Sequence, residues 1–111
     1  MKIDSFSFGS ISISGKKFSH DVTVSWDGEI RERESNHLFS KAEAIELLMK
    51  DPELIIVGCG TAGLMKIDPA AEEAVKKEKI KLLSGKTTDM VQEFNKHNKK
   101  KKVVALFHLT C

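Results

Sequence analysis

A chain of 111 residues with 41% hydrophobic and 31% charged side chains is long enough for one hydrophobic core and too short for two, which predicts a single soluble domain over residues 1–111. No apolar run approaches the roughly 20 residues that cross a bilayer, and the N-terminal segment lacks the apolar stretch of a signal peptide, so we expect no membrane contact and a cytoplasmic location. A net charge of +2 does not by itself indicate binding to nucleic acid, and two cysteines are too few for a disulfide scaffold.

Residues 3–33 are predicted to form an antiparallel meander, because apolar and polar side chains alternate along them with the period of a half-buried strand. If Gly15 and Lys16 form a two-residue turn, Ile13 and Phe18 become cross-strand neighbours on one face. We expect this meander to extend or cover the sheet that the rest of the chain forms.

A further hairpin is predicted at Asp27-Gly28, a pair of residues typical of a type I′ turn. The segment 29–33 that follows has one apolar residue in five. It is therefore expected to be an edge strand, whose charges discourage pairing with the edges of other molecules.

The first helix is predicted to begin at Ser40, because Ser40 and Glu43 have the spacing of a capping box. Asp51-Pro52 marks its end, since the residue before a proline is pushed out of the α conformation. We expect its apolar face to be buried, and this face consists of Ala42, Ile45, Leu48 and Met49.

Helices and strands then alternate to the end of the chain, which predicts parallel strands joined by right-handed crossovers. The first of these strands, residues 54–57, is continuously apolar and should be buried on both faces. The later elements are a helix from Asp68 to Lys77, a strand over 80–83, a helix over 89–98 capped by Thr87 or Thr88, and a strand over 103–109. The predicted fold class is α/β, with a parallel βαβαβ core and an N-terminal antiparallel meander.

A glycine-spaced segment, Gly58-Cys-Gly-Thr-Ala-Gly63, follows the buried strand at a place where α/β sheets bind ligands. It satisfies the G-x-G-x-x-G pattern of dinucleotide-binding folds. However, residues 64–67 look extended where a helix should begin, and no acidic residue follows the second strand. We therefore favour a tight turn in which glycines allow backbones to approach closely.

A second loop, Ser84-Gly-Lys-Thr-Thr88, is similar to the end of a phosphate-binding P-loop. Ile80 stands where the first glycine of that motif should be, which excludes a Walker motif. Lys86 and the free amides of the following helix are still a candidate anion site, with simple capping by a threonine as the favoured alternative.

Cys59 and Cys111 each lie just past the end of a predicted parallel strand, so their sulfur atoms are candidates for a close approach. His108 is near Cys111 in the sequence, but strand alternation would place these two side chains on opposite faces. We therefore favour two free thiols, one buried and one exposed, over a thiol enzyme or a redox pair.

Five lysines lie within residues 96–102 without interleaved aromatic side chains. This composition favours a solvated loop, and we do not expect nucleic-acid binding. No group of His, Cys, Asp or Glu residues has the spacing of a metal motif, so neither a metal nor a cofactor is expected.

Three segments resemble the Mth-type domain family: Ile3-Asp-Ser-Phe-Ser-Phe-Gly9, Gly58-Cys-Gly with Gly63-Leu-Met-Lys66, and His108-Leu-Thr-Cys111. Arg33 followed by His37 also fits, while Glu32 and Asn36 stand where tryptophan and glycine are usual. The resemblance spans nearly the whole chain and implies a three-layer fold with a mixed sheet. Better-studied relatives, a mitochondrial respiratory complex I assembly factor and a cytosolic adipogenesis-associated protein, imply a scaffold or interaction role.

We therefore expect a non-catalytic binding or assembly module with a protein partner or a homo-oligomeric state. The alternative is a small enzyme or a protein that binds a small anionic metabolite at the carboxyl ends of the parallel strands. The candidate pocket for this alternative is formed by Gly58, Gly60, Gly63, Lys86 and His108, with Arg33 and His37 at its rim.

Overall fold

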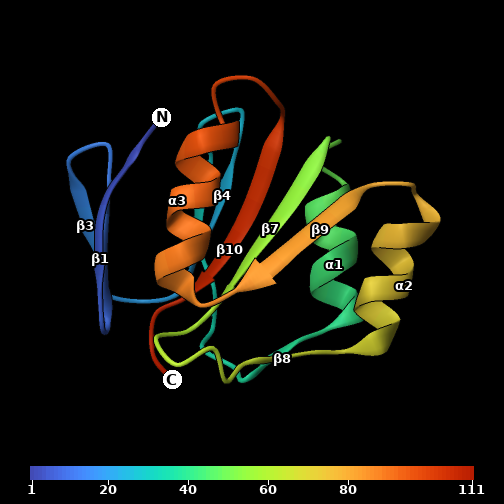
Figure 1. Ribbon diagram of the computed structural model, residues 1–111, viewed down its shortest axis with the longest axis horizontal. Helices are drawn as coiled ribbons and strands as arrows, with labels where there is room; N and C mark the ends of the chain where they lie inside the picture. The colour runs from blue at the N-terminus through green and yellow to red at the C-terminus, as the bar shows by residue number, and fades with distance from the viewer.

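A five-stranded mixed sheet forms the centre of the fold in the computed structural model, which describes residues 1–111 (Figure 1). Its strands lie in the order β5 (Ile30–Glu32), β4 (Val22–Ser25), β10 (Val103–His108), β7 (Leu54–Cys59) and β9 (Lys81–Gly85). The last three strands are parallel to one another, whereas β4 and β5 are antiparallel to their neighbours. The predicted α/β class, with its mixed sheet and parallel core, is confirmed.

Both faces of the sheet are covered, which is why the central strands β7 and β10 are apolar and buried along their whole lengths. On one face, α3 (Thr87–His97) packs over the sheet, and on the other face α1 (Lys41–Leu48) and α2 (Pro69–Lys77) do so (Figure 1). Alternate side chains of β7 therefore enter two different cores: Ile56 packs on the α3 side and Ile55 on the α1–α2 side.

The N-terminal meander divides between two sheets. Strands β1 (Ile3–Ser7), β2 (Ser10–Ile13) and β3 (Lys16–Phe18) form a separate antiparallel sheet beside α3, and only β4 and β5 extend the central sheet (Figure 1). The side chain of Asn95 joins this small sheet to α3, because it accepts a hydrogen bond from the Ile3 N–H and donates one to the Ile3 carbonyl oxygen (2.9 and 2.8 Å).

Two turns differ from their predicted geometry. The first turn consists of Ser14 and Gly15, both with positive φ, so Ile11 rather than Ile13 faces Phe18. The predicted cross-strand pair is wrong because the turn lies one residue earlier in the chain.

The second hairpin, predicted at Asp27-Gly28, has a three-residue loop in place of a type I′ turn. Only Gly28 has a positive φ (92°), and the Gly28 N–H donates to the Ser25 carbonyl oxygen (2.9 Å). A type I turn followed by a left-handed glycine is the usual geometry of such loops. β5 lies at the edge of the sheet, as predicted.

The capping box that starts α1 is confirmed, since the Ser40 side chain accepts from the Glu43 N–H and the Glu43 side chain accepts from the Ser40 N–H. The predicted buried face of α1 is wrong. Ala44 and Leu47 are the buried residues of this helix, while Ile45 is 45% exposed and Met49, just after it, is 80% exposed. None of the three helices is long and apolar enough to traverse a bilayer.

Thr87 has another role than the predicted helix cap. No side chain caps α3, which begins at Thr87, two residues before the predicted start. The Thr87 hydroxyl donates to the His108 carbonyl oxygen (2.7 Å) and accepts from the Gly60 N–H (2.8 Å). This buried hydroxyl therefore connects the start of α3 to the ends of two parallel strands.

Replacing Thr87 with valine keeps its shape but leaves the buried Gly60 N–H and His108 carbonyl group without this partner. We expect Thr87→Val to lower the free energy of unfolding by about 2–4 kcal/mol, the cost of two unpaired buried groups. Urea denaturation measures the change. The exposed neighbour Thr88 provides the control, and an equal loss in Thr88→Val would contradict the assigned role.

Candidate functional site

The carboxyl ends of the three parallel strands meet at one edge of the sheet. Gly58 of β7 lies opposite both Gly85 of β9 and Phe107 of β10, and Cys59 lies opposite His108. This common edge is where the sequence places a binding site. The polar side chains gathered there form two connected parts: a buried ion-pair network and, in front of it, a group of two histidines and a cysteine.

Asp21, which precedes β4, is the centre of the buried network and is only 2% exposed. One carboxylate oxygen accepts from the Arg33 guanidinium (2.8 Å) and lies 2.6 Å from His108 Nδ1. The other oxygen accepts from the Leu109 N–H (2.9 Å). Asp21 therefore joins β4 to the end of β10 and to the segment after β5.

Arg33 extends the network toward α1. Its guanidinium makes two hydrogen bonds to the Glu43 carboxylate and also donates to the carbonyl oxygens of Asn36 and Leu38. Burial by itself would lower the pKa of Arg33, but the hydrogen bonds and charges of Glu43 and then Asp21 outweigh it and raise this pKa. Arg33 is thus a permanently charged, fully bonded group inside the fold, and it borders a depression of about 300 Å³ that none of the other predicted pocket residues line.

His108 has no exposed surface, and its Nε2 atom has no hydrogen-bond partner. The ring packs edge-to-face against His37, with 5.3 Å between the ring centroids. His37 in turn lies 3.1 Å from the Cys111 sulfur, measured from Nδ1. One ligand atom from each of the three lies within 4.8 Å of the others, and we call His37, His108 and Cys111 the strand-end cluster.

The prediction that His108 and Cys111 lie on opposite faces is wrong, because β10 ends at His108 and strand alternation stops there. The chain then turns and crosses the loop after β7. Backbone N–H groups of Thr61 and Ala62 donate to the carbonyl oxygens of Thr110 and Cys111 (3.3 and 2.9 Å). These bonds hold Cys111 beside the histidines.

Gly60 makes that crossing feasible. Its φ of 98° suits glycine, and a Cβ atom at this position would lie 2.1 Å from the Thr110 carbonyl oxygen. Gly60 therefore allows two backbones to approach closely, as predicted from the sequence. This close approach places Cys111 in the cluster.

The remaining predicted pocket residues lie elsewhere on the same edge. Gly58 is inside β7, where an added Cβ would collide with the Thr87 hydroxyl (2.8 Å). Gly63 and Lys86 border a shallow, open depression of about 460 Å³ beside Cys59. Arg33 lines a different depression from Gly63 and Lys86, and only His37 and His108 among the predicted residues meet in the strand-end cluster.

The sequence does not clearly indicate that three residues of this edge have a role in the site. In the sequence, Asp21 is an ordinary polar residue before a predicted strand. The capping box alone accounts for a glutamate at position 43. Thr87 is expected as a helix cap. A buried role for Asp21 follows only from the pairing of β4 with β10, which places it beside His108 and Leu109.

A groove lies between α1 and α2, away from the strand-end cluster. It has a volume of about 460 Å³ and five of its nine lining residues are apolar. The apolar residues are Ile45, Leu48, Met49, Ala70 and Ala74, and the charged ones are Lys41, Glu73, Lys77 and Glu78. We call it the α1–α2 groove.

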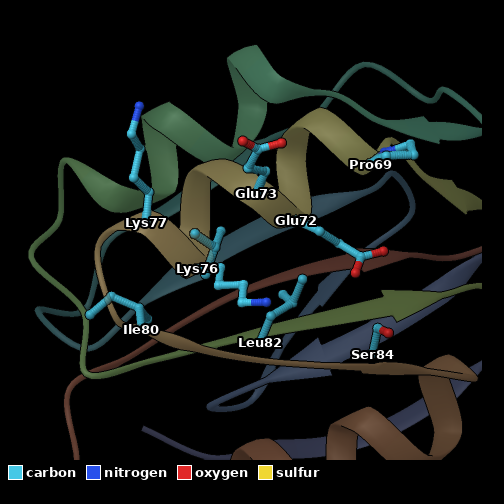
Figure 2. A pocket seen from close by; sticks show the side chains of 9 residues that line it. Pro69, Glu72, Glu73, Lys76, Lys77, Ile80, Leu82 and Ser84 are labelled. Atoms are coloured by element: carbon cyan, nitrogen blue, oxygen red, sulfur yellow. The ribbon is translucent and has the colours of Figure 1, made fainter.

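A larger hollow of about 780 Å³ lies on the other flank of α2, above the edge strand β9 (Figure 2). The side chains of Glu72 and Lys76 point from α2 toward β9, whereas Glu73 and Lys77 point away (Figure 2). Charged side chains therefore line much of this hollow, as expected for a solvated surface.

Replacing Asp21 with asparagine removes the buried negative charge that Arg33 and His108 share. We expect Asp21→Asn to lower the free energy of unfolding by about 3–5 kcal/mol, as when a buried ion pair loses one partner. Asp27→Asn is the control, because the Asp27–Lys50 pair is exposed and water screens it. Equal losses in the two variants, measured by urea denaturation, would contradict the central role of Asp21.

The two free thiols should differ in reactivity. Burial raises the pKa of Cys59, against a weaker opposing effect of the Gly85 backbone and of Arg33, so little thiolate forms at neutral pH. We expect Cys111 to react at least about tenfold faster with a maleimide at pH 7, because the thiolate is the reacting species. Intact mass with peptide mapping measures the order of labelling, and faster reaction of Cys59 would refute this assignment.

Comparison with solved structures supports the fold. A conserved hypothetical protein, PH1505 from Pyrococcus horikoshii OT3, is 27% identical, and the match covers all of both chains with a TM-score of 0.91. A structure described as MT938 is 24% identical, with 99% of this chain and 98% of that chain covered and a TM-score of 0.82.

A third structure, a Mth938-like domain from Bordetella pertussis, is 14% identical, and the match covers 97% of this chain and 85% of that chain with a TM-score of 0.72. No curated protein matches the chain. A family model described as a protein of unknown function (DUF498/DUF598) matches residues 3–108. The chain therefore belongs to this family, and its fold is that of the Mth-type domains.

Proposed function

We propose that this domain is a non-catalytic protein-binding module, and that its α1–α2 groove binds an amphipathic helix of a partner protein. The observation that carries the proposal is the apolar surface left open on α1. Ile45 is 45% exposed and Met49 is 80% exposed, although both belong to the face that the sequence pattern marks for burial. Large neighbouring apolar groups on a surface are typical of interaction sites.

The exposure follows from the way α1 packs. The helix places Ala44 and Leu47 against the sheet, and these residues supply its contribution to the core. Leu48 is half-buried and packs against the same core, whereas the exposed side chains of Ile45 and Met49 line the groove beside α2. Because α1 has one apolar face for the core and a second one beside α2, the second face is free for a partner.

The shape of the groove favours a helix of another protein over a second copy of this chain. A two-fold dimer brings the same patch of each copy together, and two concave surfaces do not fill each other. A helix is convex, and helices that lay an apolar stripe into a groove are a common form of peptide recognition.

The charges at the groove indicate the chemistry of the partner. Lys41 and Lys77 provide positive charge, and Glu73 and Glu78 provide negative charge. A helix with an apolar stripe flanked by both acidic and basic residues is therefore complementary to it. Charges of this kind set orientation and specificity more than affinity.

The alternative, an enzyme or an anion-binding protein with a glycine-lined pocket, has less support. Gly58 and Gly60 are closed in by neighbouring groups, and Lys86 borders only an open depression. A metabolite that buries most of its surface needs a more enclosed site.

Site-directed photo-crosslinking in cells tests the proposal. A photoreactive residue at Ala74, which lines the groove, should form an adduct with a partner peptide that can form an amphipathic helix. Adding Ile45→Lys and Met49→Lys should reduce the adduct by more than about tenfold, because two desolvated contacts become charged. The matched control is Phe8→Lys with Leu64→Lys, since both side chains are highly exposed and lie outside the groove.

Three results would contradict the proposal. The adduct could persist in the groove variant, decline equally in the control variant, or contain a second copy of this chain. Circular dichroism and melting temperature should be the same in both variants, because each changes only exposed side chains.

A further inference from the structure

We propose that the strand-end cluster binds one zinc ion through His37, His108 and Cys111, with the fourth coordination position open. This site is separate from the α1–α2 groove and does not depend on the function proposed for it. Its ligands come from two distant parts of the chain, residue 37 and residues 108–111, so no local metal-binding motif reveals it.

The unpartnered nitrogen of His108 points to a ligand. The residue is fully buried, and its Nε2 atom has no hydrogen-bond partner. Buried polar atoms in native structures are nearly always paired, so an orphan atom on a histidine that lies beside two further metal-binding side chains requires an explanation. A metal ion coordinated by Nε2 supplies the missing partner.

Asp21 prepares that nitrogen for coordination. Its carboxylate lies 2.6 Å from Nδ1 of His108, so the proton of a neutral imidazole resides on Nδ1 and donates to the carboxylate. The lone pair of Nε2 is then directed away from Asp21. Metal-binding histidines almost always have such a carboxylate or carbonyl partner on the other nitrogen, because it fixes the tautomer and orients the ring.

The spacing of the donor atoms is close to that of a tetrahedral site. Zinc bonds of about 2.0–2.3 Å imply donor atoms about 3.3–3.6 Å apart. The Cys111 sulfur and His37 Nδ1 are 3.1 Å apart, and the whole group lies within 4.8 Å. Small side-chain rotations of His37 and Cys111, neither of which is fully buried, bring the atoms to bonding distance.

The backbone already holds the three ligands in place. His108 ends β10, and Cys111 is hydrogen-bonded to the loop after β7. The His37 carbonyl oxygen accepts from the Lys66 N–H (2.9 Å), next to the short parallel pair of β6 (Leu38–Phe39) and β8 (Lys66–Ile67). Little chain entropy is therefore lost when the ion binds.

Charge also favours a divalent cation. The network behind the cluster contains two carboxylates, Asp21 and Glu43, and one guanidinium, Arg33, which leaves one negative charge. The Cys111 thiolate adds a second when it coordinates a metal. Two imidazoles and one thiolate suit zinc among the divalent ions, and three protein ligands leave a position for water or a further ligand.

Metal titration of the reduced, chelator-treated protein tests the proposal. We expect one zinc ion per chain and a rise in melting temperature with zinc. Cobalt should substitute with a tetrahedral spectrum that includes a thiolate charge-transfer band. Cys111→Ser should abolish that band, and Cys111→Ser and His37→Gln should each weaken zinc binding by at least about 10–100-fold, the loss typical of removing even a supporting residue.

The controls are His20→Gln and His97→Gln, which remove the two surface histidines that lie beside a glutamate. Both variants should bind zinc as tightly as the unmodified chain. The proposal is overturned by the absence of saturable zinc binding, by binding that survives Cys111→Ser and His37→Gln, or by binding that is lost in the surface controls. Binding of copper(I) alone by the same residues would overturn the assignment to zinc.

Discussion

The Asp21 carboxylate is the interaction on which the rest of this structure depends. It accepts from Arg33 and Leu109 and bonds to His108, so one buried group connects the start of β4, the segment after β5 and the end of β10. Because Arg33 also binds Glu43, the same network fixes the first turn of α1. A buried carboxylate is tolerable only when its oxygens are fully bonded. The antiparallel extension of the sheet and its parallel core are thus locked together at the edge that carries the strand-end cluster.

A second constraint at this edge is the close approach of backbones around Gly58 and Gly60. Both positions exclude a side chain, and the Thr87 hydroxyl occupies the space between them by bonding to Gly60 and His108. The cluster is therefore built on a layer of glycine and threonine that offers no cavity of its own. This arrangement explains how a glycine pattern similar to a nucleotide motif can serve a different purpose: it lets Cys111 lie over the end of β7.

Most of the central fold is predictable from the sequence because it rests on local signals. The apolar strand at 54–57, the cap at Asp68 with Pro69 and the alternation of helices and strands predict a parallel core, and strands β7, β9 and β10 do form it. The site is less predictable, because its parts are joined by tertiary contacts. From the sequence, His37 and His108 are expected near the same edge. Asp21 reaches this edge because β4 pairs with β10, and Cys111 reaches it because the chain turns after β10. No periodic pattern in the sequence predicts either placement.

The error on α1 is informative for a physical reason. A helical pattern shows which residues are apolar, but it cannot show whether an apolar face meets the protein's own sheet or another molecule. Ala44 and Leu47 are enough to pack α1 on the sheet, and the larger side chains Ile45 and Met49 are left at the surface. Both side chains line the same groove, and neighbouring apolar groups on a surface are typical of interaction sites. The proposed partner helix would cover them, so the face of α1 that was wrongly predicted to be buried is the face on which the proposed function depends.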